Sequence, residues 1–225
     1  MEVIFIIAIL IFSIVIHEVA HGSMANSLGD PTARYAGRLS LNPLKHLDPM
    51  GSFIVPFMLV IMKAPFIIGW AKPVPINPYN FTDQKYGHLK VSLAGPLSNL
   101  SLALIFGLAS RLIPLEVGVR KAIGEGFSSL GREMVAAGFW GQVFYLFLFI
   151  VFINTLLAIF NLIPIPPLDG SHILFTFFPS LENKMGEIYA RMGFIGFIVP
   201  FLLLFMLFPF IFQLVFGVFR LIAGI

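Results

Sequence analysis

Residues 3–28 have the sequence VIFIIAILIFSIVIHEVAHGSMANSL. The apolar run 3–16 leads directly into the motif HEVAH at 17–21, and Gly-Asp-Pro follows at 29–31. The length of the run and its stop signal predict one membrane helix over 3–28. No Lys or Arg precedes the run and no small-residue cleavage pattern follows it, so we expect a retained helix and not a signal peptide.

The whole chain is apolar. Of its 225 residues, 58% are hydrophobic, 11% are charged and 26 are Phe, whereas about a quarter of the residues in a soluble domain are charged. This composition predicts a lipid environment and a length sufficient for about five or six passes. The absence of Cys excludes disulfides and thiolate metal sites. The net charge of +3 comes from scattered Lys and Arg, which argues against a nucleic-acid partner.

The motif at 17–21 has the HExxH spacing. Side chains four residues apart lie on one helix face, so His17 and His21 can bind one zinc ion. Glu18 points about 100° away, where it can activate a zinc-bound water as general base. Three ionisable groups in one membrane helix favour a functional site. The alternative is a pair of hydrogen-bonded interior histidines with Glu18 as their partner.

Zinc requires a third protein ligand and an open position. Asp169 is a candidate because it follows an apolar span, 141–163, and a proline-broken segment. Non-helical backbone at membrane depth is tolerated where it lines a cavity, and such a segment can present a carboxylate to a metal. An ordinary Asp-Gly turn at a helix end explains the same residues equally well.

Further apolar segments predict an all-α polytopic membrane protein with about four to six transmembrane helices. Clear spans cover 91–113 and 141–163, and at least one more lies in 192–222, interrupted by Pro200 and Pro209. The sequence has no internal repeat and no low-complexity linker, which predicts a single integral-membrane domain over 1–225.

Three other segments are less regular. Residues 50–70 are apolar but broken by prolines and Lys63, which favours a re-entrant hairpin over a straight span. Residues 37–41 fit a short strand, residues 71–80 lie in a Pro- and Asn-rich loop, and residues 171–191 fit a loop with a short helix.

The motifs together resemble those of the site-2 protease family of intramembrane zinc metalloproteases, in a minimal form without a PDZ or CBS module. The resemblance is carried by five segments: HEVAHG at 17–22, GRLSLNP at 37–43 with the nearby HLDP at 46–49, AGPLSN at 94–99 and NLIPIPPLDG at 161–170. It implies that Asp169 is the third zinc ligand. It also implies a catalytic role for Asn99, whose amide would donate to an oxyanion or hold the substrate backbone. The alternative for Asn99 is a hydrogen bond between packed helices.

The metal residues must lie at one depth. His17 is about 21 Å along its helix from Val3, past the midplane of a core about 30 Å thick. Asp169 follows the end of 141–163, so the helix over 3–28 and the helix over 141–163 must end on the same side of the membrane. The span 91–113 must then begin on that side, and 50–70 must leave and return on it. Lys and Arg are more numerous on this side. We therefore expect an integral protein of the cell membrane with its active site toward the cytoplasm.

These features predict an intramembrane zinc metalloprotease with one Zn²⁺ ion. It would hydrolyse a peptide bond in or near the transmembrane segment of a membrane-protein substrate, as in regulated intramembrane proteolysis. A strand at 37–41 or in 71–80 could pair with the unwound substrate, and 50–70 could act as a gate. Its partners would be that substrate and the lipid bilayer, and no feature indicates an oligomeric state.

Two other functions use similar residues. A transporter or channel could pass protons or metal ions along intramembrane His, Glu and Asp, but it would have more symmetric halves and polar groups spread along a pathway. A different membrane zinc peptidase could cut soluble or misfolded proteins at the membrane surface, and would usually take its third ligand, often a Glu, from another helix.

Overall fold

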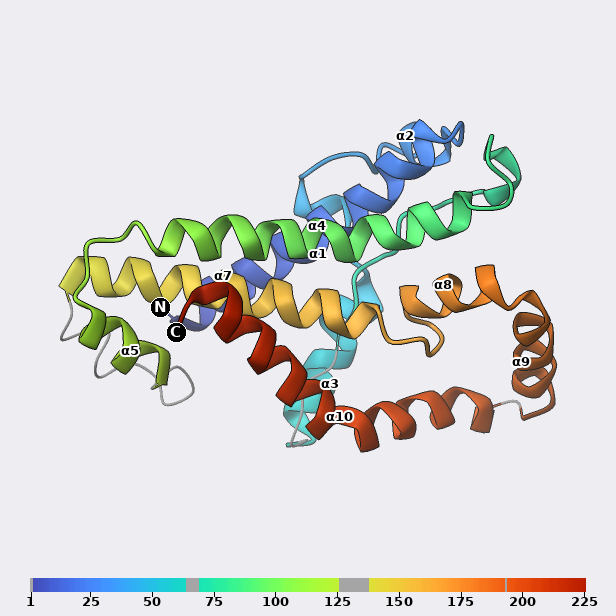
Figure 1. Ribbon diagram of the computed structural model, residues 1–225. Coiled ribbons are helices and arrows are strands. Elements are labelled where there is room, and N and C mark those ends of the chain that lie inside the picture. The colour runs from blue at the N-terminus through green and yellow to red at the C-terminus, as the bar shows by residue number, and fades with distance from the viewer. Residues whose placement is uncertain (1, 64–68, 126–137, 193) are drawn as a thin grey trace. The chain divides into compact units, whose positions relative to one another are not determined.

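The computed structural model describes residues 2–63, 69–125, 138–192 and 194–225 (Figure 1). Within these ranges every regular element is a helix. Four of the described helices are long and apolar enough to cross a membrane: Phe5–Ser27, Gly87–Ser110, Gly138–Asn161 and Leu202–Ala223. The prediction of an all-α polytopic membrane protein is therefore confirmed, with four candidate spans.

The chain divides into two compact units, Val3–Gly95 and Pro96–Ile225. The boundary lies inside helix α4 (Gly87–Ser110), which continues through Pro96. Proline inside a helix removes one backbone hydrogen bond, and membrane helices tolerate this because neighbouring groups satisfy the freed carbonyl.

The first unit begins with the predicted long helix. Helix α1 covers Glu2–Ser27, and the chain leaves it through Gly29, whose φ is +99°. Short elements follow: α2 (Thr32–Tyr35), η1 (Pro43–Lys45), the π-helical η2 (Pro49–Ile54), α3 (Val55–Ile61) and η3 (Pro78–Asn80). A small apolar cluster of Ala25, Phe81 and Val91 joins the end of α1 to the start of α4.

The predicted strand at 37–41 is not present, and residues 71–77 have no regular secondary structure either. The reason lies in the local hydrogen bonds. Gly37 has φ +65° and ends α2, while the Arg38 N–H returns to the Ala33 carbonyl at 2.9 Å. The carbonyls that a strand would use for pairing accept from side chains instead: Gly37 O from Lys45 Nζ, and Ser40 O from His46 Nε2.

The chain continues from η2 into α3, and Trp70 is hydrogen-bonded back to η2. The Trp70 N–H donates to the Gly51 carbonyl at 3.1 Å, and the Ser52 hydroxyl donates to the Trp70 carbonyl at 3.0 Å. A Cβ on Gly51 would lie 2.4 Å from the Trp70 ring, so only glycine lets the indole pack there. Residues 64–68 lie outside the described residues, so the re-entrant hairpin stays a prediction.

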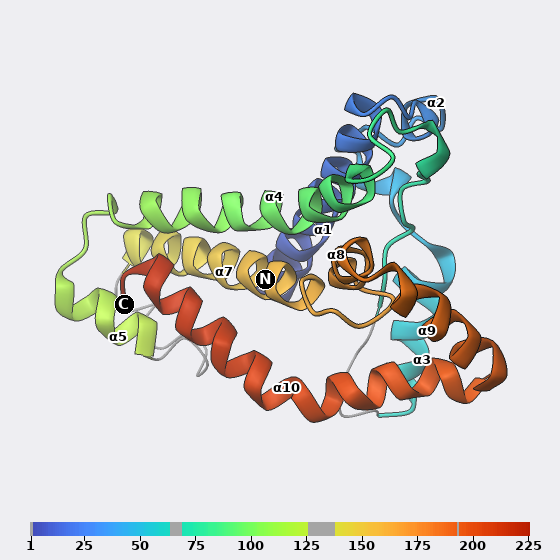
Figure 2. The same cartoon turned by 45° about the vertical axis from the view of Figure 1, so that its right-hand side comes forward.

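The second unit contains α5 (Val117–Glu125), α7 (Gly138–Asn161), α8 (Asp169–Phe177), α9 (Pro179–Met192) and α10 (Phe194–Ala223). Its core is apolar and forms where the C-terminal part of α10 and helix α5 pack on α7 (Figures 1 and 2). Phe144, Leu148 and Val151 of α7 and Phe219 of α10 are at most 1% exposed. Phe152 adds edge-to-face contacts to Phe212 and Phe219.

Two expectations for this unit need correction. Pro200 and Pro209 do not interrupt the last span, because α10 runs through both. Residues 171–191 are not a loop with one short helix but parts of α8 and α9. Asp169 is thus the first residue of a helix, where a carboxylate is favoured by the positive end of the helix dipole.

Candidate metal centre

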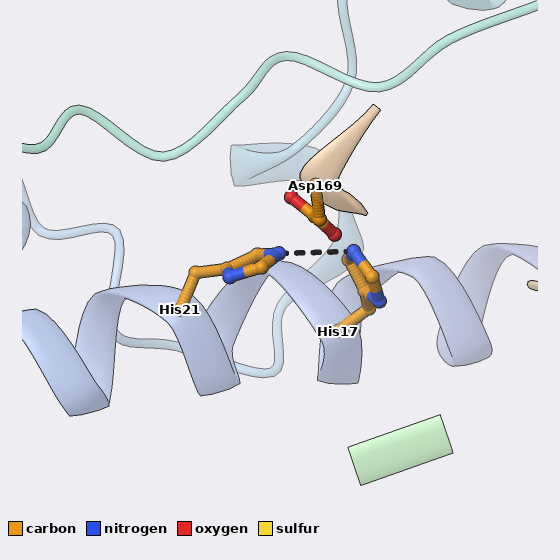
Figure 3. A group of neighbouring side chains, drawn as sticks. All are labelled: His17, His21 and Asp169. Carbon is orange, nitrogen blue, oxygen red and sulfur yellow. Dashed lines mark hydrogen bonds between the residues drawn. The ribbon is translucent and has the colours of Figure 1, made fainter. Parts of the chain in front are cut away.

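His17 and His21 lie one turn apart on α1 and face each other. Both are buried, at 6% and 7% exposure. Their Nε2 atoms are 3.0 Å apart, joined by a hydrogen bond (Figure 3), and their rings meet edge to face with centroids 4.5 Å apart. The i, i+4 spacing therefore directs two imidazole nitrogens to one point, as the sequence predicted.

A backbone carbonyl determines the tautomer of His21. Its Nδ1 lies 2.7 Å from the Val91 carbonyl oxygen, which can only accept. The proton of a neutral His21 is therefore on Nδ1, and its Nε2 carries the lone pair, which a metal would bind in place of the hydrogen bond from His17. A second hydrogen bond of this kind is usual for metal-binding histidines and orients the ring.

Gly95 makes room for the two imidazoles. A Cβ at this position would lie 2.3 Å from His21 Nε2 and 2.6 Å from His17 Cε1. Any larger residue would occupy the space of the ring atoms, so steric contact with the imidazoles requires glycine at this position of the AGPLSN segment. The segment stands out in the sequence, but nothing in its pattern predicts this contact.

Glu18 is held by the chain segment that passes α1. Its Oε2 accepts a hydrogen bond from the Val74 N–H at 2.8 Å, while Oε1 has no hydrogen-bond partner among the described residues. The carboxylate is thus fixed at one oxygen, and the other remains available to water or substrate.

Asp169 begins α8 directly after the segment that ends α7. Gly170 lets α8 start so close to that segment, because a Cβ there would lie 2.3 Å from the Leu162 carbonyl oxygen and 2.5 Å from that of Ile163. The Ser171 hydroxyl donates to the Leu168 carbonyl at 2.7 Å and strengthens this first turn. The Asp-Gly pair is therefore a helix start in close contact with backbone, and not a free turn.

The structure contains one candidate group of ligands in its described part. His17, His21 and Asp169 each offer one ligand atom, and these atoms all lie within 4.8 Å of one another (Figure 3). Two imidazole nitrogens and one carboxylate oxygen, without a thiolate, are a donor set that suits Zn²⁺ with one position left for water or substrate. The residues present therefore fit a zinc ion.

Asn99 is fully buried on α4. Its Nδ2 donates to Asn154 Oδ1 at 2.8 Å, and Asn154 Nδ2 donates to the Ile150 carbonyl at 2.9 Å. Asn154 is not among the site residues predicted from the sequence. The signal was present, because an amide within the apolar run 141–163 is costly in a membrane unless it is bonded.

These observations define a helical membrane protein with a histidine and carboxylate site suited to zinc. Comparison with known proteins gives the family. The profile of Peptidase family M50 matches residues 81–207. The chain is 37% identical over 198 residues to the Bacillus subtilis protein named "Putative zinc metalloprotease YwhC", covering 88% of this chain and 80% of that one. The chain therefore belongs to peptidase family M50, the site-2 protease family.

Other relatives are more distant. Proteins named "Putative zinc metalloprotease Rip2" are 29% identical over 167 residues in Mycolicibacterium smegmatis and 28% identical over 165 residues in Mycobacterium tuberculosis. Those matches cover 74% and 73% of this chain, and it spans about half, 54%, of each of these two relatives. No solved structure matches the chain.

Proposed function

We propose that the chain is an intramembrane zinc metallopeptidase that cuts a membrane protein in or near its transmembrane segment. The observation that carries the proposal is the convergence of His17, His21 and Asp169 ligand atoms within 4.8 Å, next to Glu18 of the same helix as the histidines. The family and the four apolar helices support a peptidase that works within a membrane.

In this proposal His17, His21 and Asp169 hold one zinc ion, and residues 1–225 form one catalytic domain. A bound zinc ion would supply a Lewis acid that polarises the scissile carbonyl and acidifies water. The protein supplies the remaining groups. The Val91 carbonyl keeps His21 in the required tautomer, and Gly95 keeps the space that both rings need.

Glu18 acts as general base and then as general acid. It takes a proton from the water whose oxygen attacks the peptide carbonyl carbon, and gives it to the amide nitrogen as the C–N bond breaks. The products are one carboxylate and one amine. Its second oxygen accepts from the Val74 N–H, so the carboxylate need not search for its position during the reaction.

Asn99 is proposed to hold the substrate backbone or the developing oxyanion through its amide. The hydrogen bond to Asn154 fixes the side chain. In the cell the protein would lie in the cell membrane with this site toward the cytoplasm, which is supported by the distribution of Lys and Arg.

The test uses purified protein in lipid with a single-span substrate. Glu18→Gln keeps the size of the side chain but removes the base, so we expect cleavage to fall at least about 100-fold with zinc content unchanged. Asp169→Ala should lose zinc. Cleavage by Glu18→Gln at the wild-type rate would overturn the peptidase assignment of Glu18, and full zinc content in Asp169→Ala would remove Asp169 from the ligands.

An uptake assay and a cleavage assay on the same purified protein distinguish a transporter from a peptidase. A transporter would take up protons or metal ions in sealed vesicles without cutting any substrate. A peptidase acting at the membrane surface would cut outside the transmembrane segment, so mass spectrometry of the products locates the bond and separates the two kinds of peptidase.

A further inference from the structure

The segment Trp70–Asn77, here called the strap, is fastened to the first unit along its length. The Trp70 N–H donates to the Gly51 carbonyl, and the Lys72 N–H donates to the His46 carbonyl at 2.9 Å. The Asn77 N–H donates to Asp30 Oδ2 at 2.7 Å. Between these points the Val74 N–H donates to Glu18. The strap therefore has fixed ends, and its middle contacts the proposed base.

The strap has no donor to offer a substrate strand around Val74. Residues 73 and 75 are prolines without an N–H, and the N–H groups of Lys72 and Val74 are already bonded within the unit. A strand edge needs free donors at alternate residues to pair with a peptide. The middle of the strap is thus built to hold Glu18 and not to pair with substrate.

Arg38 is the side chain that fastens the middle of the strap. It is 7% exposed, and its guanidinium Nη2 donates to the carbonyls of Lys72 and Pro73. The structure shows no carboxylate paired with Arg38 among the residues that it describes. A buried cation whose partners are two carbonyls is costly for stability, which favours a specific task over simple packing.

The two ends of one loop hold Lys72 from both sides. The His46 carbonyl accepts the Lys72 N–H, and Arg38 donates to the Lys72 carbonyl. His46 is itself 1% exposed and fixed through Nε2 to the Ser40 carbonyl at 2.8 Å. Since Val74 is only two residues beyond Lys72, any shift of Lys72 moves the N–H that reaches Glu18.

We propose that Arg38 is a positioning residue for the proposed reaction: it holds the strap so that the Val74 N–H orients the Glu18 carboxylate. This inference rests on Glu18 being the general base. A displacement of about 1 Å at a reacting group lowers rate about 100-fold, and the loss falls on kcat because neither Arg38 nor the strap's middle donors bind the substrate.

The first experiment follows the strap without using activity. In a Trp140→Phe background, Trp70 is the only Trp of the chain, and its emission reports the end of the strap. Arg38→Ala should shift that emission and increase its quenching by acrylamide. Arg34→Ala removes an exposed Arg of α2 and should leave the emission unchanged. An unchanged emission in Arg38→Ala would overturn the inference.

The second experiment is a double-mutant cycle on cleavage. Val74→Pro removes the N–H that binds Glu18, and Val74→Ala is the matched control that keeps it. We expect Arg38→Ala and Val74→Pro each to lower kcat about 10- to 100-fold with KM changed less than about twofold and zinc retained, whereas Val74→Ala, which keeps the N–H, should lose less kcat than Val74→Pro. The double variant should lose no more than the worse single variant, because both remove the same hydrogen bond.

Two further results decide the question. Added guanidinium ion should restore part of the kcat of Arg38→Ala, and Arg38→Lys should retain more activity than Arg38→Ala. Wild-type kcat in Val74→Pro, or losses that multiply in the double variant, would overturn the inference while an inactive Glu18→Gln leaves the proposed function standing. Full activity in Glu18→Gln would overturn both, although the Trp70 emission still shows whether Arg38 holds the strap.

Discussion

The two units of the chain are stabilised by different forces. In Val3–Gly95 three buried polar side chains fix the backbone by hydrogen bonds: Asp30 accepts from Asn77, Arg38 donates to Lys72, and His46 donates to Ser40. In Pro96–Ile225 the core is a continuous apolar cluster on α7 and α10. Lipid is as apolar as Phe, so packing inside the second unit gains mainly close contact, while hydrogen bonds in the first fix direction. The unit that orients the proposed base is the one built on directional bonds.

The largest expected effect is on zinc binding, which depends on the placement of the two histidines in the first unit. Gly95→Ala adds a methyl group within 2.3 Å of His21 Nε2, so at least one imidazole must move. We expect zinc content to fall from about one ion per chain toward none, with metal affinity reduced about 100-fold, as measured by mass spectrometry of the intact protein. Gly217→Ala on α10, where a Cβ would meet nothing within 4 Å, is the control. Full zinc content in Gly95→Ala would contradict the proposed placement of the histidines.

The second prediction tests the apolar unit. Phe144 is 1% exposed in the cluster on α7, so Phe144→Ala leaves a cavity. In soluble cores this change costs about 3–5 kcal/mol, but part of that is transfer from water, which lipid does not supply. We expect about 2–3 kcal/mol, measured by unfolding in mixed detergent.

The matched control for this change is an exposed phenylalanine of the same unit. Phe205 on α10 is 73% exposed, so Phe205→Ala opens no internal cavity and should leave unfolding unchanged. Equal losses in the two variants would mean that the apolar cluster is not what stabilises the second unit.

Local patterns gave most of what the sequence could predict. The four spans follow from long apolar runs, and His17, Glu18 and His21 follow from a spacing of one helical turn. The prediction of a strand at 37–41 was wrong because Gly37 and the side chains of Lys45 and His46 satisfy the backbone locally. Alternation of residue types does not reveal such bonds.

Contacts between distant residues were beyond the sequence. Val74 is 56 positions from Glu18, and nothing near either residue indicates the other. Gly95 and Asn154 are unusual in the sequence, as a glycine in a spanning helix and an amide in an apolar run. An energetically unfavourable residue suggests a specific role, but the sequence does not show which residue it contacts. The resemblance to a family supplied Asp169, where the residues alone left an ordinary turn equally open.

A third prediction concerns the polar network of the first unit. Burial of Asp30 would raise its pKa, but hydrogen bonds from the Thr32 side chain, the Asn77 N–H and the Asn80 amide outweigh burial and lower the pKa below 3.8. Asp30→Asn keeps one acceptor oxygen and loses the bond to the Asn77 N–H at 2.7 Å. We expect a loss of about 1.5 kcal/mol at neutral pH, the lower end for a bond to a charged group.

The pH dependence of that loss has a definite sign. Because folding lowers the pKa of Asp30, its stabilisation is complete above about pH 4 and is lost as pH falls through the folded value. The difference in melting temperature between wild type and Asp30→Asn should therefore shrink below pH 4 and be constant from pH 5 to 7. A difference that grows on acidification would show that the carboxylate is not what the network stabilises.

The smallest effect is expected at an ion pair of the same unit that is not buried. Lys90 Nζ lies 2.7 Å from Asp83 Oδ2, with side-chain exposures of 49% and 30%, and this hydrogen bond lowers the pKa of Asp83. This distance equals that of the Asp30–Asn77 hydrogen bond. Distance alone would therefore predict a similar contribution to the stability of the folded protein. Water and salt screen an exposed pair, however, and ordering a long Lys side chain opposes its formation. Lys90→Ala should leave the melting temperature within replicate scatter at 0.15 M salt, and a loss equal to that of Asp30→Asn would show that burial does not decide which polar contacts stabilise this unit.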